Sequence, residues 1–116
     1  MYKSLNDASI QSSIFKKGQT KIWYVKDSWA IRLIMFEKKL NKALVPTTHI
    51  LLGEIAGTDL EEIFQMLQGE NWSPEGEARE LIKNKELNHT SMLVGDVIQI
   101  GEVFYLVDEV GFKELN

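Results

Sequence analysis

The last quarter of the chain constrains the fold more than any other part. Residues 89–112 read HTSMLVGDVIQIGEVFYLVDEVGF, in which two short runs of β-branched and aromatic residues flank Gly101. Such runs, joined by a tight glycine turn, are typical of a β-hairpin. We therefore predict strands over residues 97–100 and 102–110, with the pattern broken at the following Gly-Phe pair.

Upstream, short apolar runs predict two more strands, over residues 21–26 and 47–55. The second run is apolar on both faces, as in an inner strand. Residues 27–44 carry a helical stripe of apolar side chains and favour a helix that ends at Pro46, although part of the segment also alternates as a strand.

Two further helices are predicted between the strands. Thr58 and Glu61 have the spacing of a capping box, and Gly69 suits the end of that helix. After a loop at residues 70–72, Ser73 is a good N-cap for a second helix.

The expected fold class is α+β, a two-layer sandwich in which helices pack on one face of a small mixed β-sheet that ends in a C-terminal hairpin. The 116 residues are expected to form a single domain, with residues 1–18 as an arm or a short helix. An unpaired edge of the final hairpin would also permit homodimerisation, which the sequence does not decide.

Composition excludes several classes of protein. The chain has no cysteine, so disulfides, thiolate metal sites and cysteine nucleophiles are absent. The N-terminal residues have neither the apolar segment nor the cleavage site of a secretory signal. No apolar run approaches the ~18 residues that a membrane span needs, so we expect a cytoplasmic protein without a membrane partner.

Charge is distributed unevenly along the chain. Residues 1–46 carry nine lysines and arginines against three acidic residues, whereas residues 47–116 carry four basic and fourteen acidic residues. This asymmetry is compatible with a basic surface for nucleic acid, with an acidic surface for a basic partner, or with attraction between the halves inside one fold.

The C-terminal pattern also resembles a known family. The family pattern runs from a polar entry rich in His and Ser through Val-(Ser or Gly)-Asp-Val-Ile to Tyr-Val-Asp and Gly-Phe. It is matched by His89, Ser91, Val94, Gly95, Asp96, Val97, Ile98, Tyr105, Val107, Asp108, Gly111 and Phe112. This run is similar to that of the YodL-like proteins, small proteins of bacteria and their mobile elements. Residues 60–68 are similar to a helix of that family, whereas residues 71–79 depart from its core pattern. The resemblance implies a phage or mobile-element accessory protein and carries over no catalytic residue.

Catalysis is the least supported function. His89, Ser91 and Asp96, with His49 in reserve, are the candidates for a small hydrolase. A nucleophilic serine needs a base within hydrogen-bond reach, and the surroundings of Ser91 do not resemble a nucleophile elbow. The alternative is that Thr90 and Ser91 bond the local backbone.

Cofactor and metal sites are not expected. The two histidines lie 40 residues apart, without a partner at ligand spacing. Glu75, Glu77, Asp96 and Asp108 could gather around a divalent cation, but no loop has the repeated oxygen ligands that calcium sites show. No glycine-rich phosphate loop is present.

Nucleic-acid binding is the second candidate function. Aromatic residues alternate with cations in the first half of the chain, as in proteins that bind single strands. The candidate residues are Lys21, Trp23, Lys26, Arg32, Lys38 and Lys39. Against this function, the whole chain is acidic, with a pI near 5.2.

Binding of a partner protein, without catalysis, is the function that we favour. The acidic second half could steer a basic partner, and Trp72, in a polar segment, is a candidate anchor of the interface. We expect the turn that follows Trp72 to adjoin the entry to the hairpin and to form one polar patch with it. The residues of this expected patch are Trp72, Ser73, Glu77, Arg79, His89, Thr90, Ser91 and Asp96.

Overall fold

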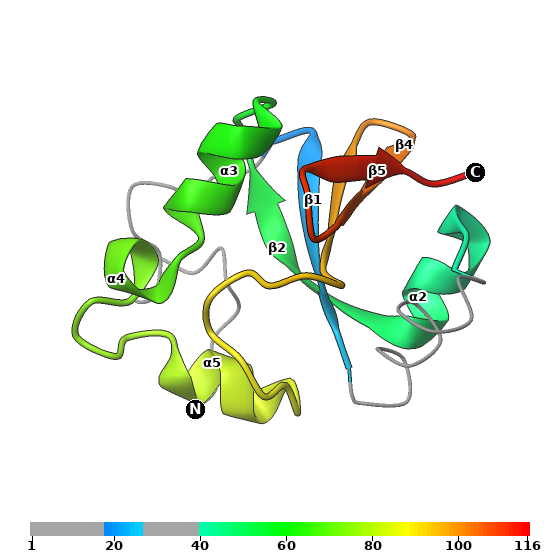
Figure 1. Cartoon of the computed structure of the whole chain (residues 1–116). Helices are drawn as coiled ribbons and strands as arrows, with labels where there is room; N and C mark the ends of the chain where they lie inside the picture. The colour runs from blue at the N-terminus through cyan, green and yellow to red at the C-terminus, as the bar shows by residue number, and fades with distance from the viewer. Residues whose placement is uncertain (1–17, 27–39) are drawn as a thin grey trace.

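The computed structural model describes residues 18–26 and 40–116. In this part of the chain, five strands form one sheet in the order β2-β1-β3-β4-β5, and every neighbouring pair is antiparallel (Figure 1). The strands are β1 (Thr20–Val25), β2 (His49–Ile55), β3 (Val97–Ile100), β4 (Val103–Val107) and β5 (Phe112–Glu114).

Short helices occupy the connections between the strands. They are the 3-10 helix η2 (Lys42–Leu44) and the α-helices α2 (Val45–Thr48), α3 (Leu60–Met66), α4 (Gly69–Trp72) and α5 (Arg79–Asn84). Helices α3, α4 and α5 lie on one side of the sheet and α2 on the other (Figure 1).

Alternation along the strands gives the sheet two buried faces. Ile22 and Tyr24 of β1 join the larger core, together with Ile98 of β3 and side chains from α3, α4 and α5. Val25 belongs to a smaller core on the opposite face. In that second core, the strand residues contact Val45 of α2 and residues close to the C-terminus.

The α+β class and the C-terminal hairpin are confirmed. Gly101 has a φ of 61°, which the tight turn between β3 and β4 requires. The expected mixed sheet is wrong in its pairing, because all described pairs are antiparallel. The expectation that helices cover one face holds for α3, α4 and α5, whereas α2 covers part of the second face.

Three local predictions around the first strands need correction or lie outside the described residues. Residues 1–17 and 27–39 are not described, so neither the arm nor most of the helix predicted over residues 27–44 is tested. Pro46 lies in the first turn of α2 rather than beyond the end of a helix. Strand β2 stands at an edge of the described sheet, not inside it, because within the described residues it pairs with β1 alone.

The helices that follow β2 begin and end at other residues than the sequence predicts. Asp59, not Thr58, caps α3, since its carboxylate accepts a hydrogen bond from the Glu62 N–H at 3.0 Å. Gly69 starts α4 instead of ending α3, so the predicted loop at residues 70–72 is helical.

The turn at residues 73–78 replaces the predicted start of a helix at Ser73. The Ser73 hydroxyl accepts a hydrogen bond from the Ala78 N–H at 2.9 Å, and Gly76 has a φ of 84°, so α5 begins only at Arg79. The predicted break at Gly111-Phe112 is a turn into the additional strand β5.

Candidate functional site

The segment of residues 88–96 connects α5 to β3 and joins the helices to the sheet. The Met92 N–H donates to the Leu67 carbonyl at 3.1 Å, at the end of α3. The Ser91 hydroxyl accepts from the Gly69 N–H at 2.7 Å, at the start of α4. We call residues 88–96 the connecting segment.

The Thr90 carbonyl is shared by two buried aromatic side chains. It accepts from the Tyr24 hydroxyl at 2.7 Å and from the Trp72 indole N–H at 3.1 Å. Tyr24 is fully buried and Trp72 is 2% exposed. One backbone oxygen therefore fixes β1 and α4 at the same point of the connecting segment.

Asp96 is the buried charged residue at the end of this segment, with 0% exposure. Its carboxylate accepts from the Val25 N–H at 2.9 Å and from the Leu93 N–H at 2.8 Å. His89 Nε2 lies 2.8 and 2.9 Å from the two carboxylate oxygens, and the His89 ring stacks on Tyr24 with centroids 4.6 Å apart. The carboxylate is thus satisfied by β1 and by the connecting segment itself.

His49, the other histidine of the chain, reaches the same turn from β2. Its Nε2 lies 2.7 Å from the Gly95 carbonyl, and its Nδ1 lies 2.7 Å from the Thr48 hydroxyl. Burial lowers the pKa of His49, an effect that the Gly95 carbonyl and the Asp96 charge oppose in part.

Burial is also the largest cause of the pKa shifts of Asp96 and Tyr24. It raises the pKa of Asp96, against the hydrogen bonds from His89 and from the backbone N–H groups of Leu93 and Val25. Burial, together with the Asp96 charge, raises the pKa of Tyr24 well above its usual value. Tyr24 therefore stays neutral and acts as a hydrogen-bond donor.

The geometry does not favour hydrolysis by His89 and Ser91. An imidazole oriented by a carboxylate is half of a catalytic triad, and His89 and Asp96 have this relation. Ser91, however, uses its hydroxyl at Gly69, at the start of α4, and not at His89. The His89–Asp96 pair instead holds the connecting segment against β1, through the Val25 N–H and the Tyr24 ring.

The residues expected to form a polar patch lie in two adjoining regions, which are joined by the hydrogen bond from the Trp72 indole to the Thr90 carbonyl. Trp72 and Asp96 are buried, so neither is an exposed anchor for a partner. His89, Thr90, Ser91 and Ser73 are half-buried, and Glu77 and Arg79 remain exposed at the turn before α5.

The candidate nucleic-acid residues are only partly described. Trp23 is half-buried against the smaller core, and its indole N–H donates to the Gln99 side chain at 3.0 Å, which restricts stacking on a base. Lys21 is half-buried and Lys26 is exposed. Arg32, Lys38 and Lys39 lie outside the described residues.

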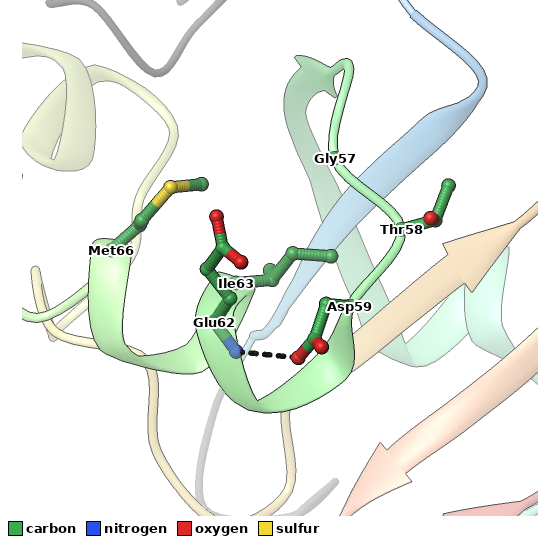
Figure 2. A pocket seen from close by; sticks show the side chains of 6 residues that line it. All are labelled: Gly57, Thr58, Asp59, Glu62, Ile63 and Met66. Atoms are coloured by element: carbon green, nitrogen blue, oxygen red, sulfur yellow. Dashed lines mark hydrogen bonds between the residues drawn. The ribbon is translucent and has the colours of Figure 1, made fainter.

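Two shallow hollows flank α3. One has a volume of about 200 Å³ and is lined by Gly57, Thr58, Asp59, Glu62, Ile63 and Met66; Figure 2 shows these residues on the loop before α3 and along the helix. The other has a volume of about 150 Å³ and is lined by Glu61, Phe64, Val107, Asp108, Glu109, Gly111 and Phe112. Both are smaller than the ~300–1,000 Å³ of ordinary small-molecule sites.

The second hollow combines an apolar floor with an acidic rim. Phe64 of α3 and Phe112 of β5 meet edge to face, with centroids 6.4 Å apart. Glu61 stands on the helix side, and Asp108 and Glu109 stand on the β4–β5 turn, all exposed. We call this site the acidic hollow.

Two further sequence expectations concern metals and membranes. Within residues 18–26 and 40–116, no three His, Asp or Glu side chains are grouped so that they could hold a metal ion. None of the helices in this described part has the length and apolar character that crossing a bilayer requires.

Comparison with known proteins gives one partial likeness. The chain is 45% identical over 38 residues to an uncharacterised protein of Acanthamoeba polyphaga mimivirus. The match covers 33% of this chain and 34% of the viral protein, so the chain spans about a third of the length of that relative. No family model matches the chain, and no solved structure matches it significantly.

Sequence reasoning missed Tyr24 and Thr48, and it held His49 only as a spare catalytic group. A signal for His49 existed: it lies within a predicted strand that is apolar on both faces, where a buried imidazole needs two partners. The partners themselves are a hydroxyl one residue away and a carbonyl 46 residues away, so periodicity gave no way to identify the second.

Proposed function

We propose that this protein acts without catalysis, by binding a basic partner protein through the acidic hollow. The observation that carries the proposal is the apolar floor formed by Phe64 and Phe112 under an exposed rim of three carboxylates. A small apolar pocket inside a charged rim is the anatomy of a protein interface, where the pocket supplies affinity and the rim supplies steering.

The surrounding charge supports the same partner chemistry. Residues 57–80, which include α3 and α4, contain seven acidic residues and one basic residue. A partner segment rich in lysine or arginine, with one apolar side chain to enter the hollow, fits this distribution. The interior polar cluster supports a non-catalytic function, because its hydroxyl and carboxylate groups are engaged in holding the backbone.

We further propose that the protein is an accessory protein of a phage or mobile element. The YodL-like pattern of the C-terminal residues and the partial likeness to a viral protein support this part of the proposal. The proposed binding at the acidic hollow does not depend on this origin.

The test is affinity capture from the native cell, followed by titration of the captured protein. The Glu61→Lys/Glu109→Lys double variant reverses one charge on each side of the hollow and should weaken binding about tenfold or more. The matched control is Glu86→Lys/Glu102→Lys, which reverses two exposed charges that do not line the hollow. Equal binding by both double variants would exclude the acidic hollow, and capture that nuclease abolishes would favour nucleic acid instead.

A further inference from the structure

Both histidines of the chain contact the two residues Gly95 and Asp96, which precede β3. His49 approaches from β2 and bonds the Gly95 carbonyl, whereas His89 precedes the turn in sequence and bonds the Asp96 carboxylate. The connecting segment is thus held at its end by two imidazole side chains that approach it from different parts of the chain.

The hydrogen-bond partners decide which nitrogen of His49 titrates. The Gly95 carbonyl can only accept, so Nε2 at 2.7 Å carries a proton in both charge states. Nδ1 is therefore the nitrogen that gains the proton. In the neutral ring it accepts from the Thr48 hydroxyl at 2.7 Å.

Proton uptake reverses one hydrogen bond. When Nδ1 gains a proton from water, it becomes a donor, and the Thr48 oxygen becomes the acceptor. The hydroxyl hydrogen of Thr48 then turns to the Leu44 carbonyl, which lies 3.2 Å from the same oxygen. Thr48 is 3% exposed, so water does not readily substitute for it.

We propose that His49, the Thr48 hydroxyl and the Gly95 carbonyl form a proton-operated latch, which holds the connecting segment against the sheet at neutral pH and releases it under mildly acidic conditions.

The direction of the pH effect follows from the linkage between proton binding and opening of the segment. Because burial lowers the pKa of His49 below its ordinary 6.5, the closed form binds the proton less well than an opened form in water. Closure is therefore most favourable above about pH 6.5 and weakens as the pH falls below it, by up to about tenfold in the opening equilibrium per pH unit. The weakening stops at the pKa of the closed form.

Other charges near His49 modify the response. Asp96 favours the charged imidazole and His89 opposes it. Asp96 itself acts in the opposite direction, because burial raises its pKa and its proton uptake favours the closed form as the pH falls. Lys26, at the end of β1, donates its backbone N–H to the Thr48 carbonyl, and its side chain is exposed.

The first experiment follows the His49 ring by ¹⁵N NMR during a pH titration. We expect the neutral ring to carry its proton on Nε2. Thr48→Val removes the acceptor for the Nδ1 proton and should shift the midpoint to lower pH, whereas Thr48→Ser should restore it. A neutral ring protonated on Nδ1, or a midpoint that Thr48→Val leaves unchanged or raises, would overturn the proposal.

The second experiment measures hydrogen exchange of the Val25 and Met92 amides between about pH 6.5 and 5.5, corrected for the intrinsic rates. Their protection should fall up to about tenfold in the natural chain and stay constant in His49→Gln. Amides of the β3–β4 hairpin serve as the internal control and should keep their protection. An equal fall in the hairpin, or a fall that persists in His49→Gln, would contradict a local latch.

Discussion

Two regions of this protein are rich in ionisable side chains, and they use them in opposite ways. Around the connecting segment, Asp96 and His49 are buried, and backbone groups occupy their hydrogen-bonding atoms. Around the acidic hollow, Glu61, Asp108 and Glu109 are exposed to water. The same chemical groups stabilise the fold in one place and remain accessible to a partner in the other.

The difference has an energetic reason. A buried polar group is costly unless it is paired, so removing one partner leaves the others unsatisfied. An exposed carboxylate interacts mainly with water, and its removal changes stability little. We therefore expect substitutions in the interior cluster to affect unfolding and substitutions at the hollow to affect association.

Asp96→Ala should have the largest effect on stability, with a loss of about 3–5 kcal/mol. It removes the acceptor of the Val25 and Leu93 N–H groups and the partner of His89. The measurement is urea unfolding at neutral pH. Glu102→Ala, at an exposed turn, is the control and should change stability by less than ~0.5 kcal/mol; similar values for both variants would refute the distinction between the regions.

Tyr24→Phe tests the shared Thr90 carbonyl. The phenyl ring preserves the packing, and the carbonyl keeps the Trp72 indole as a donor, so only one hydrogen bond is lost. We expect a loss of about 1–1.5 kcal/mol in the same unfolding measurement. Tyr105→Phe, on β4, should lose clearly less, and an unchanged stability of Tyr24→Phe would show that the Tyr24 hydroxyl contributes nothing.

Asp59→Ala tests a carboxylate that lies beside a hollow but has a structural function. Asp59 caps α3 through the Glu62 N–H, so its loss should cost about 1 kcal/mol. Thr58→Ala is the matched control, since the neighbouring hydroxyl is not the cap. Thermal unfolding distinguishes the two, and a greater effect at Thr58 would restore the capping box that the sequence favours.

Glu61→Lys/Glu109→Lys should have the smallest effect on stability. Both side chains are exposed, and we expect a change of about 0.5 kcal/mol or less, mainly from placing a cation at the start of α3. Circular dichroism melting measures it. A much larger loss would mean that this rim supports the fold, and reduced binding by the same variant would then need another explanation.

Local signals predicted the hairpin and the first strand well, since each depends on a few neighbouring residues. Gly101 specifies the turn, and alternation along residues 20–25 places Ile22 and Tyr24 toward the larger core. The predicted starts of the helices were less accurate. Thr58 and Asp59 are both competent caps, and only the path of the chain from β2 into α3 selects the second.

The candidate site was predictable only in part. The sequence placed the turn after Trp72 beside the entry to the hairpin, and the hydrogen bond from Trp72 to Thr90 confirms that neighbourhood. It did not predict that Trp72 is buried there, because an aromatic residue in a polar segment is equally compatible with an anchor and with a local core. The acidic hollow joins α3 to the β4–β5 turn, more than 40 residues away, and no local pattern links them.

Four of the strands (β1 to β4), the α+β class and the excess of acidic residues in the second half were thus evident from the sequence alone, because backbone preference and charge are local properties. The tertiary structure alone decided which carboxylates are buried and which are exposed. Asp96 and Asp108 follow similar apolar runs, yet antiparallel pairing encloses one between β1 and the connecting segment and leaves the other at an open turn.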